Sequence, residues 1–590
     1  MGWTAWYALG VTLLTILALA RDWVAPATAM MGGAVLLLLA GVVSPTEAFS
    51  GFGNPAPMTV AALYILARAV EKTGLLNPLI YGLLGRGDGE RATLARLLLP
   101  AVVASAFLNN TPIVAMLIPV VLAWCERRGA SPSRFLMPLS FGVVLGGVGT
   151  AIGTSTNLVV SGLLESQGMA PMGLFEITPV GLPVIGIALV VLLLTTRWLL
   201  PDRTPVAGRL DADVREFMVQ MRVVPEGPMA GREVEAAGLR NLQGVFLVQI
   251  QRIDGELVAP VGPETVLRAE DRLWFVGRVD MVVDLQKMRG LESAEQRQLT
   301  HFDTARHTFT EAVLGPASPL VGRTIKELEF RSRYQAAVVA IHRSGERIRA
   351  KLGEVRLKVG DTLLLLTDQA FHSRWRDRND FLLVAPLGGT PPGVTKKAWL
   401  VGLVAVGIVF LAGAGVLPIL QAALAGVALL IMAGVLTAGE ARSAVDLDVI
   451  IVIAASFAYG VAIENTGLGA AVAHGISGIF GGFGAHAVLF GVVVATVLLT
   501  ELVTNNAAAA LMFPIGLEAA RSLSLEPRSF AIAVAVAASC SFLTPIGYQT
   551  NTMVYGPGGY RFSDYARLGL PLTITMIVMI VIMVPIVWGW

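Results

Sequence analysis

Charge is spread very unevenly along this chain, and that constrains the fold more than any other feature. Residues 202 to 397 carry 29 basic and 26 acidic side chains, which is 55 of the 86 charged residues in the chain. The other 394 residues share only 31 charges, whereas about a quarter of the residues in an average soluble protein are charged. Two apolar blocks therefore flank a soluble insert, which predicts an α-helical polytopic membrane protein.

The composition excludes several classes of function. A net charge of +2 gives no case for a nucleic-acid partner. Cys125 and Cys540 are the only cysteines, so a disulfide framework or a zinc site is excluded. Residues 1 to 20 lack the basic leader and cleavage site of a secretory signal, so we expect a retained first transmembrane helix. Nothing points to an enzyme or to an organic cofactor.

Several apolar runs are long enough to cross a bilayer, and four others are too short. The long runs are 24–44, 135–163, 174–200, 416–437 and 568–590. The short runs come in pairs: 93–108 and 111–125 meet at Asn109-Asn110, and 487–503 and 507–520 meet at Asn505-Asn506. Half-length pairs that meet at polar residues predict re-entrant hairpins, with tips at 109–111 and 504–506.

An internal repeat relates the two apolar blocks. At an offset of 395 residues, Asn109-Asn110-Thr111 aligns with Thr504-Asn505-Asn506. With one residue lost, residues 150–157 (TAIGTSTN) align with residues 544–551 (TPIGYQTN). These segments are too polar for an unbroken helix at membrane depth, so we expect unwound helices at 153–157 and 547–552. Two halves, each with a hairpin and a broken helix, indicate a transporter whose site lies near the midplane.

Loop charge predicts the orientation and the domain order. The loop from Glu126 to Arg134 is more basic than its counterpart from Glu518 to Arg528, which favours inverted repeats with the first loop inside the cell. We expect a multi-pass protein of the inner or plasma membrane with a cytoplasmic insert. The predicted domains are a membrane repeat at 1–201, insert domains at 202–298 and 299–394, and a second membrane repeat at 395–590.

The hairpin tips have the chemistry of an ion site. Asparagine is a favoured N-cap and Pro112 suits a first helical turn, so we expect a helix with free N–H groups to begin at the first tip, and such ends attract anions. A hydroxyl stands four residues before each tip, at Ser105 and Thr500. Hydroxyls, amide oxygens and carbonyls suit sodium. The alternative is that these polar residues only join helices by hydrogen bonds, which a matched repeat disfavours.

The insert contains two similar segments of short β-branched runs, which indicate strands. Their runs include 245–250 and 269–276 in the first segment, and 337–341 and 358–366 in the second. The second segment resembles a regulator-of-conductance C-terminal (TrkA-C) domain through Ser318-Pro319-Leu320-Val321-Gly322-Arg323 and Gly360-Asp361, and the first resembles it more loosely. The resemblance implies two small α+β domains that dimerise and bind a small regulatory ligand.

The paired membrane motifs resemble the divalent-anion/sodium symporter family of the ion transporter superfamily, in particular its sulfate-transporting branch. The resemblance rests on both tips, on Thr500-Glu501, and on the Gly-Thr-Ser-Thr-Asn segment at 153–157, over about two thirds of the chain. It implies an elevator-type carrier that is a homodimer in the lipid bilayer, imports a small inorganic anion, and binds one sodium ion in each repeat. Expected substrate residues are Asn110, Thr111, Ser155, Thr156, Asn505, Asn506, Thr550 and Asn551. Expected sodium residues are Ser105, Asn109, Asn110, Gly153, Thr154, Asn157, Thr500, Thr504, Asn505, Gly547 and Asn551.

The departures from the family pattern bear on the substrate. Asn506 supplies an amide where dicarboxylate carriers have threonine, and the candidate site holds no arginine, lysine or histidine. A fully ionised oxyanion such as sulfate suits such a site. A dicarboxylate or citrate, arsenite export, and proton coupling remain alternatives, and a ligand-gated channel is disfavoured because no selectivity-filter motif occurs. For Glu501 we favour structural support over cation or proton binding.

Overall fold

The computed structural model describes most of the two apolar blocks and the strands of the insert. The described residues are 2–21, 23–75, 82, 89–203, 218–239, 242, 245–258, 261–277, 288, 290–293, 307–315, 318–343, 346–348, 352–368, 371–375, 380–386, 395–545 and 547–590. They form two units, one made of residues 1–202, 390–555 and 560–590 and one made of residues 203–389 and 556–559. The predicted boundary between residues 298 and 299 lies outside the described residues.

The first unit, which we call the membrane unit, is helical and repeats one order of elements. Its first half contains α1 (Trp3–Ala20), α2 (Pro26–Leu39), α3 (Pro45–Ala48), α4 (Ser50–Gly53), α5 (Pro55–Thr73), α7 (Glu90–Ser105), α8 (Asn110–Arg128), η1 (Pro132–Arg134), α9 (Leu136–Gly147), α10 (Ser155–Ser166) and α11 (Thr178–Leu199). Its second half contains α16 (Ala398–Gly413), α17 (Ile419–Met432), α18 (Ala438–Ala444), α19 (Leu447–Asn465), α20 (Leu468–Phe480), η3 (Gly481–Phe483), α21 (Ala485–Thr500), α22 (Asn505–Ser522), α23 (Pro527–Ala538), α24 (Gln549–Tyr555) and α25 (Phe562–Trp588).

The repeat extends further toward the N-terminus than the sequence motifs indicate. Helix α3 begins with a capping box at Ser44 and Glu47, and α18 begins with one at Thr437 and Glu440, at an offset of 393 residues. Helix α2 and helix α17 are each 14 residues long. Most of each membrane half is therefore a copy of the other.

Two predicted spans are shorter than expected. The runs 24–44 and 416–437 contain α2 and α17, whose 14 residues rise only about 21 Å, less than the roughly 30 Å of a hydrocarbon core. Gly41 and Gly434, with φ of +68° and +63°, follow these helices in the left-handed conformation that terminates a helix. Among the described residues, the helices long and apolar enough to cross a membrane are α1, α11, α19 and α25.

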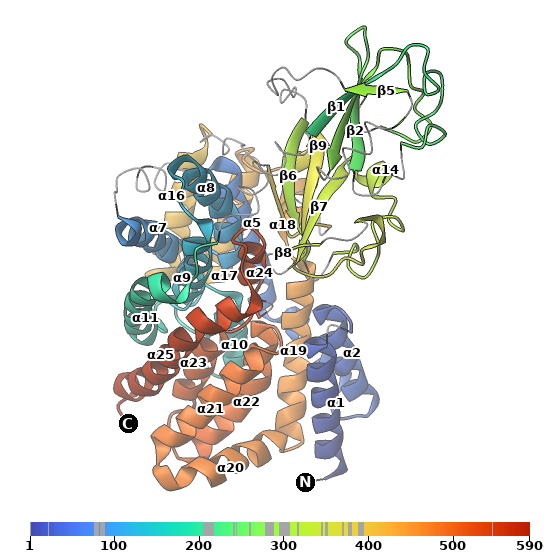
Figure 1. Ribbon diagram of the computed structural model, residues 1–590. Helices are drawn as coiled ribbons and strands as arrows, with labels where there is room; N and C mark the ends of the chain where they lie inside the picture. The colour runs from blue at the N-terminus through green and yellow to red at the C-terminus, as the bar shows by residue number, and fades with distance from the viewer. Residues whose placement is uncertain are drawn as a thin grey trace. The chain divides into compact units, whose positions relative to one another are not determined.

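Both predicted hairpins are present, as α7–α8 and α21–α22. Figure 1 shows α7 and α8 toward one end of the membrane unit and the α20–α22 region toward the other. The first broken helix is α9–α10 and the second is α23–α24. The breaks begin earlier than predicted, after residues 147 and 538, and residues 155–157 and 549–552 are helical. Glycines at 146, 147 and 149 lie at the end of α9, and Pro545 lies within the second break, where it disfavours helix.

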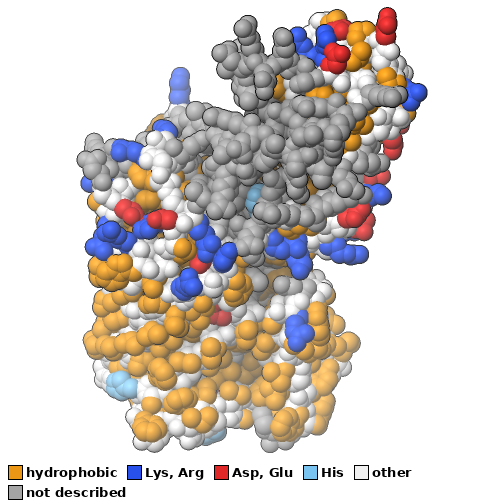
Figure 2. Space-filling view, in the orientation of Figure 1, with side chains coloured by type: hydrophobic (Ala, Val, Ile, Leu, Met, Phe, Trp, Pro, Cys, Tyr) orange, Lys and Arg blue, Asp and Glu red, His pale blue; other side chains and the backbone are white. Residues whose placement is uncertain are grey.

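The surface of the membrane unit suits a lipid environment. Figure 2 shows hydrophobic side chains over most of the helical part of the face that it presents. Trp3, Leu39, Trp399, Met432 and Phe483 are among the most exposed, each above 60%. A soluble protein rarely leaves so many large apolar side chains exposed together, so the lipid bilayer is their natural partner.

The second unit contains two antiparallel sheets of five strands. The first sheet has the order β3-β2-β4-β1-β5, and the second has the order β10-β6-β9-β7-β8. The strands of the first are β1 (Met218–Val223), β2 (Val245–Gln251), β3 (Leu257–Val258), β4 (Arg272–Gly277) and β5 (Leu291–Ser293). The strands of the second are β6 (His307–Val313), β7 (Ala337–Arg343), β8 (Glu346–Arg347), β9 (Thr362–Asp368) and β10 (Leu383–Pro386), with α14 (Phe330–Tyr334), η2 (Leu352–Glu354) and α15 (Phe371–Trp375) beside them.

The two sheets repeat one ion pair between an arginine and a buried aspartate. Arg252, directly after β2, pairs with Asp271 just before β4, and Arg343 at the end of β7 pairs with Asp361 just before β9 at 2.7 Å. Asp361 is fully buried and raises the pKa of Arg343. The strand predictions in both segments of the insert are confirmed.

Candidate functional site

Four helix N-termini meet within the membrane unit. Helices α8 and α22 begin at the hairpin tips, and α10 and α24 begin after the breaks. The Thr111 hydroxyl donates to Gln549 Oε1 at 3.2 Å, and the Ser155 hydroxyl donates to Asn506 Oδ1 at 3.0 Å. These two contacts are equivalent in the repeat, because each joins the last residue of one tip to the first helical residue after the break of the other half. Free N–H groups at such ends favour an anion.

Further hydrogen bonds close this junction. Asn110 Nδ2 donates to the Tyr548 hydroxyl at 3.1 Å, and Thr156 Oγ1 donates to Asn506 Oδ1 at 3.3 Å. Thr154 also hydrogen-bonds the Tyr548 side chain. The residues named in this paragraph and the preceding one are side chains without a formal charge, so an anion would be held there by neutral donors.

Behind the first tip lies a cluster of oxygens that we call the first cradle. Ser105 Oγ is 2.6 Å from both Asn110 Oδ1 and the Val143 carbonyl oxygen. A hydroxyl has a single proton, so it can satisfy only one of these acceptors at a time. Asn157 Nδ2 donates to the carbonyls of Gly147 and Thr150 at 3.1 and 2.9 Å, while Asn157 Oδ1 is buried without a hydrogen bond.

The second cradle repeats this arrangement behind the second tip. Thr500 Oγ1 is 2.9 Å from Asn505 Oδ1 and 2.6 Å from the Ala538 carbonyl oxygen, each residue 395 positions after its counterpart. Asn551 Nδ2 donates to the carbonyls of Ser541 and Thr544 at 2.9 and 3.3 Å. Thr504 caps α22 by accepting from the Ala507 backbone N–H.

Both cradles have donor sets that fit a sodium ion. Each cradle contains more neutral hydroxyl, amide and carbonyl oxygens than there are N–H and O–H groups to hydrogen-bond them. The remaining oxygen lone pairs can bind a cation, and hard cations prefer oxygen ligands. Gly153 and Gly547 allow the backbone of each break to lie close to its cradle. A Cβ on Gly153 would lie 2.5 Å from the Gly147 carbonyl oxygen, and a Cβ on Gly547 would lie 2.2 Å from Ser541 Oγ. In the described part of the chain, no cluster of three His, Cys, Asp or Glu side chains suits a transition metal.

Some expected residues lie beside the junction rather than in it. Ser140 Oγ on α9 is within hydrogen-bond distance of Thr550 Oγ1 at 2.9 Å and of Asn551 Oδ1 at 2.7 Å, so these two side chains join α24 to α9. Asn109 accepts from the Thr111 backbone N–H at 3.4 Å and hydrogen-bonds Tyr64 of α5.

The sequence reasoning missed several residues at the junction. Tyr548 and Gln549 stand inside the repeated motif at the positions of Thr154 and Ser155, and because the residue types differ the repeat does not mark them. Asp446, which caps α19, hydrogen-bonds Gln549. No sequence signal marked Asp446, Tyr64 or Ser140, because each reaches the site only through packing of distant helices.

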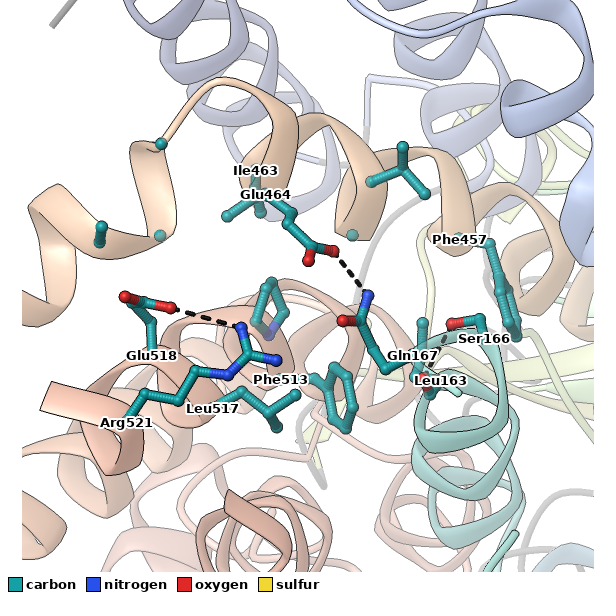
Figure 3. Close-up of a pocket in the computed structure, with 16 residues that line it drawn as sticks. Leu163, Ser166, Gln167, Phe457, Ile463, Glu464, Phe513, Leu517, Glu518 and Arg521 are labelled. Atoms are coloured by element: carbon teal, nitrogen blue, oxygen red, sulfur yellow. Dashed lines mark hydrogen bonds and ion pairs between the residues drawn. The ribbon is translucent and has the colours of Figure 1, made fainter. Parts of the chain in front are cut away.

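A pocket opens at the opposite ends of two site helices (Figure 3). It lies between α10, α19, α20 and α22, and it contains none of the expected site residues. Gln167 Nε2 donates to Glu464 Oε2 at 2.6 Å across it, and Arg521 pairs with Glu518 at 3.5 Å. Its first residue on α22, Phe513, is eight residues from the tip, which is about 12 Å along a helix. The same two helices therefore connect the junction to this pocket.

Comparison with known proteins agrees with this architecture. The profile of the citrate transporter family, CitMHS, matches residues 15–522 and 482–590. An uncharacterized transporter of Synechocystis is 35% identical over 100% of this chain and 98% of its own length. A putative sulfur deprivation response regulator of Chlamydomonas reinhardtii is 34% identical over 92% and 95%. Sodium/sulfate cotransporter 2 of the same alga is 27% identical over 98% and 89%.

The matching family and relatives, with the apolar helices, identify a multi-pass membrane transporter, and the chain is not an enzyme. It belongs to the citrate transporter family of the ion transporter superfamily.

Proposed function

We propose that this protein is a secondary active transporter that imports a divalent oxyanion, sulfate first, coupled to sodium. The observation that carries the proposal is the meeting of four helix N-termini, two from hairpin tips and two from broken helices, beside two oxygen cradles. The sulfate assignment is also supported by the names of the algal cotransporters. Proton coupling is the alternative for the driving ion.

The substrate would lie between the tips, held by Asn110, Thr111, Ser155, Thr156 and Asn506. Hydroxyl, amide and backbone N–H donors recognise an oxyanion by geometry, and the helix ends supply partial positive charge. The cradles would hold one sodium ion each, near enough to offset the substrate's charge. Asn110 belongs to both parts, because its amide oxygen faces the first cradle while its nitrogen donates to Tyr548 at the junction, and Asn505 is its counterpart in the second half.

Citrate is the second candidate substrate, because the matching family is described as citrate transporters. A tricarboxylate is larger than sulfate and would need more donors or a basic side chain, and the residues that form the junction include no such side chain.

Uptake of labelled sulfate into proteoliposomes tests the proposal. An inward sodium gradient should drive accumulation above equilibrium, a matched proton gradient should not, and neither succinate nor citrate should compete. Block by citrate, or citrate uptake without sulfate uptake, would move the substrate to the carboxylate class. Passive equilibration without accumulation would instead indicate a channel.

The site assignment is tested by Asn110→Ala and Asn505→Ala. Each should lower sulfate uptake at least a hundredfold in protein that remains folded, because each removes a cradle oxygen and a junction donor together. Asn465→Ala, at the exposed end of α19, is the matched control and should transport normally. Normal uptake by both site variants would refute the assignment.

An elevator movement is also part of the proposal. If α10 slides against α19 during transport, a disulfide between Gln167→Cys and Glu464→Cys should stop uptake, and a reductant should restore it. The native thiols of Cys125 and Cys540 are buried and should not interfere. Full uptake by the cross-linked protein would refute the movement.

We assign the insert a regulatory role in a homodimer of the cell membrane, with the insert in the cytoplasm and a small ligand on its TrkA-C-like domains. Deleting residues 209–390 behind a short linker should leave sulfate binding intact. Loss of binding by well-folded protein would contradict this division of roles.

A further inference from the structure

The two cradles differ at two positions that the repeat makes equivalent. Where the first half has Ala106, the second has Glu501, and where the first half has Gly147, the second has Ser541. Both differences add a polar side chain to the second cradle. The chemistry of the two candidate cation sites is therefore unequal, although their backbones follow the same course.

Ser541 places a spare oxygen in the second cradle. Its hydroxyl is fully buried and makes no hydrogen bond. A Cβ on Gly547 would lie only 2.2 Å from Ser541 Oγ, so this hydroxyl lies directly against the backbone of Gly547 in the break. Gly147, the counterpart of Ser541 in the first cradle, has no side chain, and a Cβ there would lie 2.9 Å from Asn110 Oδ1. An unpaired buried hydroxyl costs free energy unless a ligand uses it.

Glu501 brings a carboxylate to the same glycine. Its Oε1 accepts the backbone N–H groups of Phe542 and Leu543, each at 2.8 Å, and so supports the break as expected. Its Oε2 accepts the Thr544 hydroxyl at 3.1 Å and lies 3.1 Å from where a Cβ of Gly547 would be. Among the described residues, no basic side chain pairs with it. A buried carboxylate without a cation is expensive at membrane depth.

From these observations we infer that the second cradle is the stronger of the two cation sites, with Glu501 as its counter-charge and Ser541 as an added oxygen ligand. The inference rests on the proposed sodium coupling. Neutral oxygens alone form the first cradle, which therefore binds sodium more weakly. In the absence of substrate, sodium fills the second cradle first.

Sodium binding can be measured without transport. We would follow the thermal unfolding of the purified full-length protein in sulfate-free buffer while sodium replaces choline at constant ionic strength. A ligand that binds only the folded state raises the unfolding temperature according to its concentration relative to its dissociation constant. The wild type should show a tight phase. Glu501→Gln should raise the apparent dissociation constant of that phase at least tenfold, and Ser541→Ala about threefold.

The variants separate this inference from the proposed function. Asn110→Ala alters the first cradle and the junction but no residue of the second cradle, so in sulfate-free buffer it should leave the tight phase unchanged. A wild type without any sodium-specific stabilisation would refute sodium coupling and this inference together. Sodium binding by the wild type with unchanged affinity in Glu501→Gln and Ser541→Ala would leave the coupling intact and overturn only the inequality.

Both substitutions in the second cradle are chosen so that the variant proteins should still fold. Glutamine keeps an oxygen for the two backbone N–H groups, and Ser541→Ala loses no hydrogen bond. If Glu501→Gln does not fold, Ser541→Ala decides alone, and unchanged sodium affinity in that variant overturns the inference.

Discussion

The insert offers a sharp test of electrostatics because Glu311 is buried in the second sheet. The residue lies on the central part of β6, opposite Leu364 of β9 and Ala385 of β10, and its exposed fraction is 2%. Within the described residues, no donor or cation reaches its carboxylate. Desolvation alone raises its pKa from 4.5 to about 7.

The sign and size of the effect follow from this shift. A carboxyl whose pKa is raised by folding binds more protons in the folded state than in the unfolded state between pH 4.5 and 7. Stability therefore falls as pH rises through that window and stays low above it. The difference between a pKa of 4.5 and one of about 7 corresponds to about 3 kcal/mol. Glu311→Gln, which cannot ionise, should recover about that amount at pH 8 and little at pH 4.5.

Hydrogen exchange in the full-length protein measures this locally. At pH 8, the amides of β6 and β9 should exchange about a hundredfold more slowly in Glu311→Gln than in the wild type. At pH 4.5 the two proteins should exchange alike, and comparing them at one pH removes the intrinsic pH dependence of exchange.

Glu329→Gln, an exposed carboxylate of the same domain, is the control and should match the wild type at both pH values. Equal exchange of wild type and Glu311→Gln at pH 8 would refute the argument, because it would mean that the buried carboxylate ionises without cost.

Three further predictions concern the insert and the site. Arg343→Ala should destabilise the second sheet by about 3 kcal/mol, because it leaves the Asp361 carboxylate buried without a cation. Faster amide hydrogen exchange in β9 would show this, and an unchanged exchange rate would contradict the role of the ion pair. Gly153→Ala should abolish sodium-dependent stabilisation of the first cradle, since its Cβ would meet the Gly147 carbonyl; sulfate uptake at wild-type sodium affinity would exclude that cradle as a cation site. Ser140→Ala should lower the free energy of unfolding by about 1 kcal/mol, because it removes the hydrogen-bond contact with α24. A lower unfolding temperature would show this, and an unchanged one would mean that other contacts position α24.

The sequence predicts the parts of this architecture that depend on local composition. The hairpins α7–α8 and α21–α22 follow from short apolar runs that meet at asparagines. The strands of the insert follow from β-branched runs with turn residues between them. In each case the decisive residues are neighbours in the chain, so the pattern is visible without knowledge of the fold.

The remaining features depend on contacts between distant segments. In the second break, Glu501 accepts the backbone N–H groups of residues 542 and 543 from a distant part of the chain, a contact that no local pattern shows. Tyr64 and Asp446 reach the junction from α5 and the start of α19, about 45 and 60 residues from the nearer tip. Such placements arise from helix packing, which local sequence patterns do not encode.

The absence of a basic side chain at the junction gives a physical reason for coupling. A divalent anion removed from water loses hydration that neutral donors and helix ends replace only in part. A sodium ion roughly 5 Å away, at an effective dielectric constant of about 20, would interact with two negative charges by about 7 kcal/mol. Because each tip asparagine belongs to both a cradle and the junction, a bound cation also orients the donor that faces the anion. Substrate without sodium should therefore bind poorly, and an arginine in place of Thr111 should weaken the dependence on sodium while it slows release.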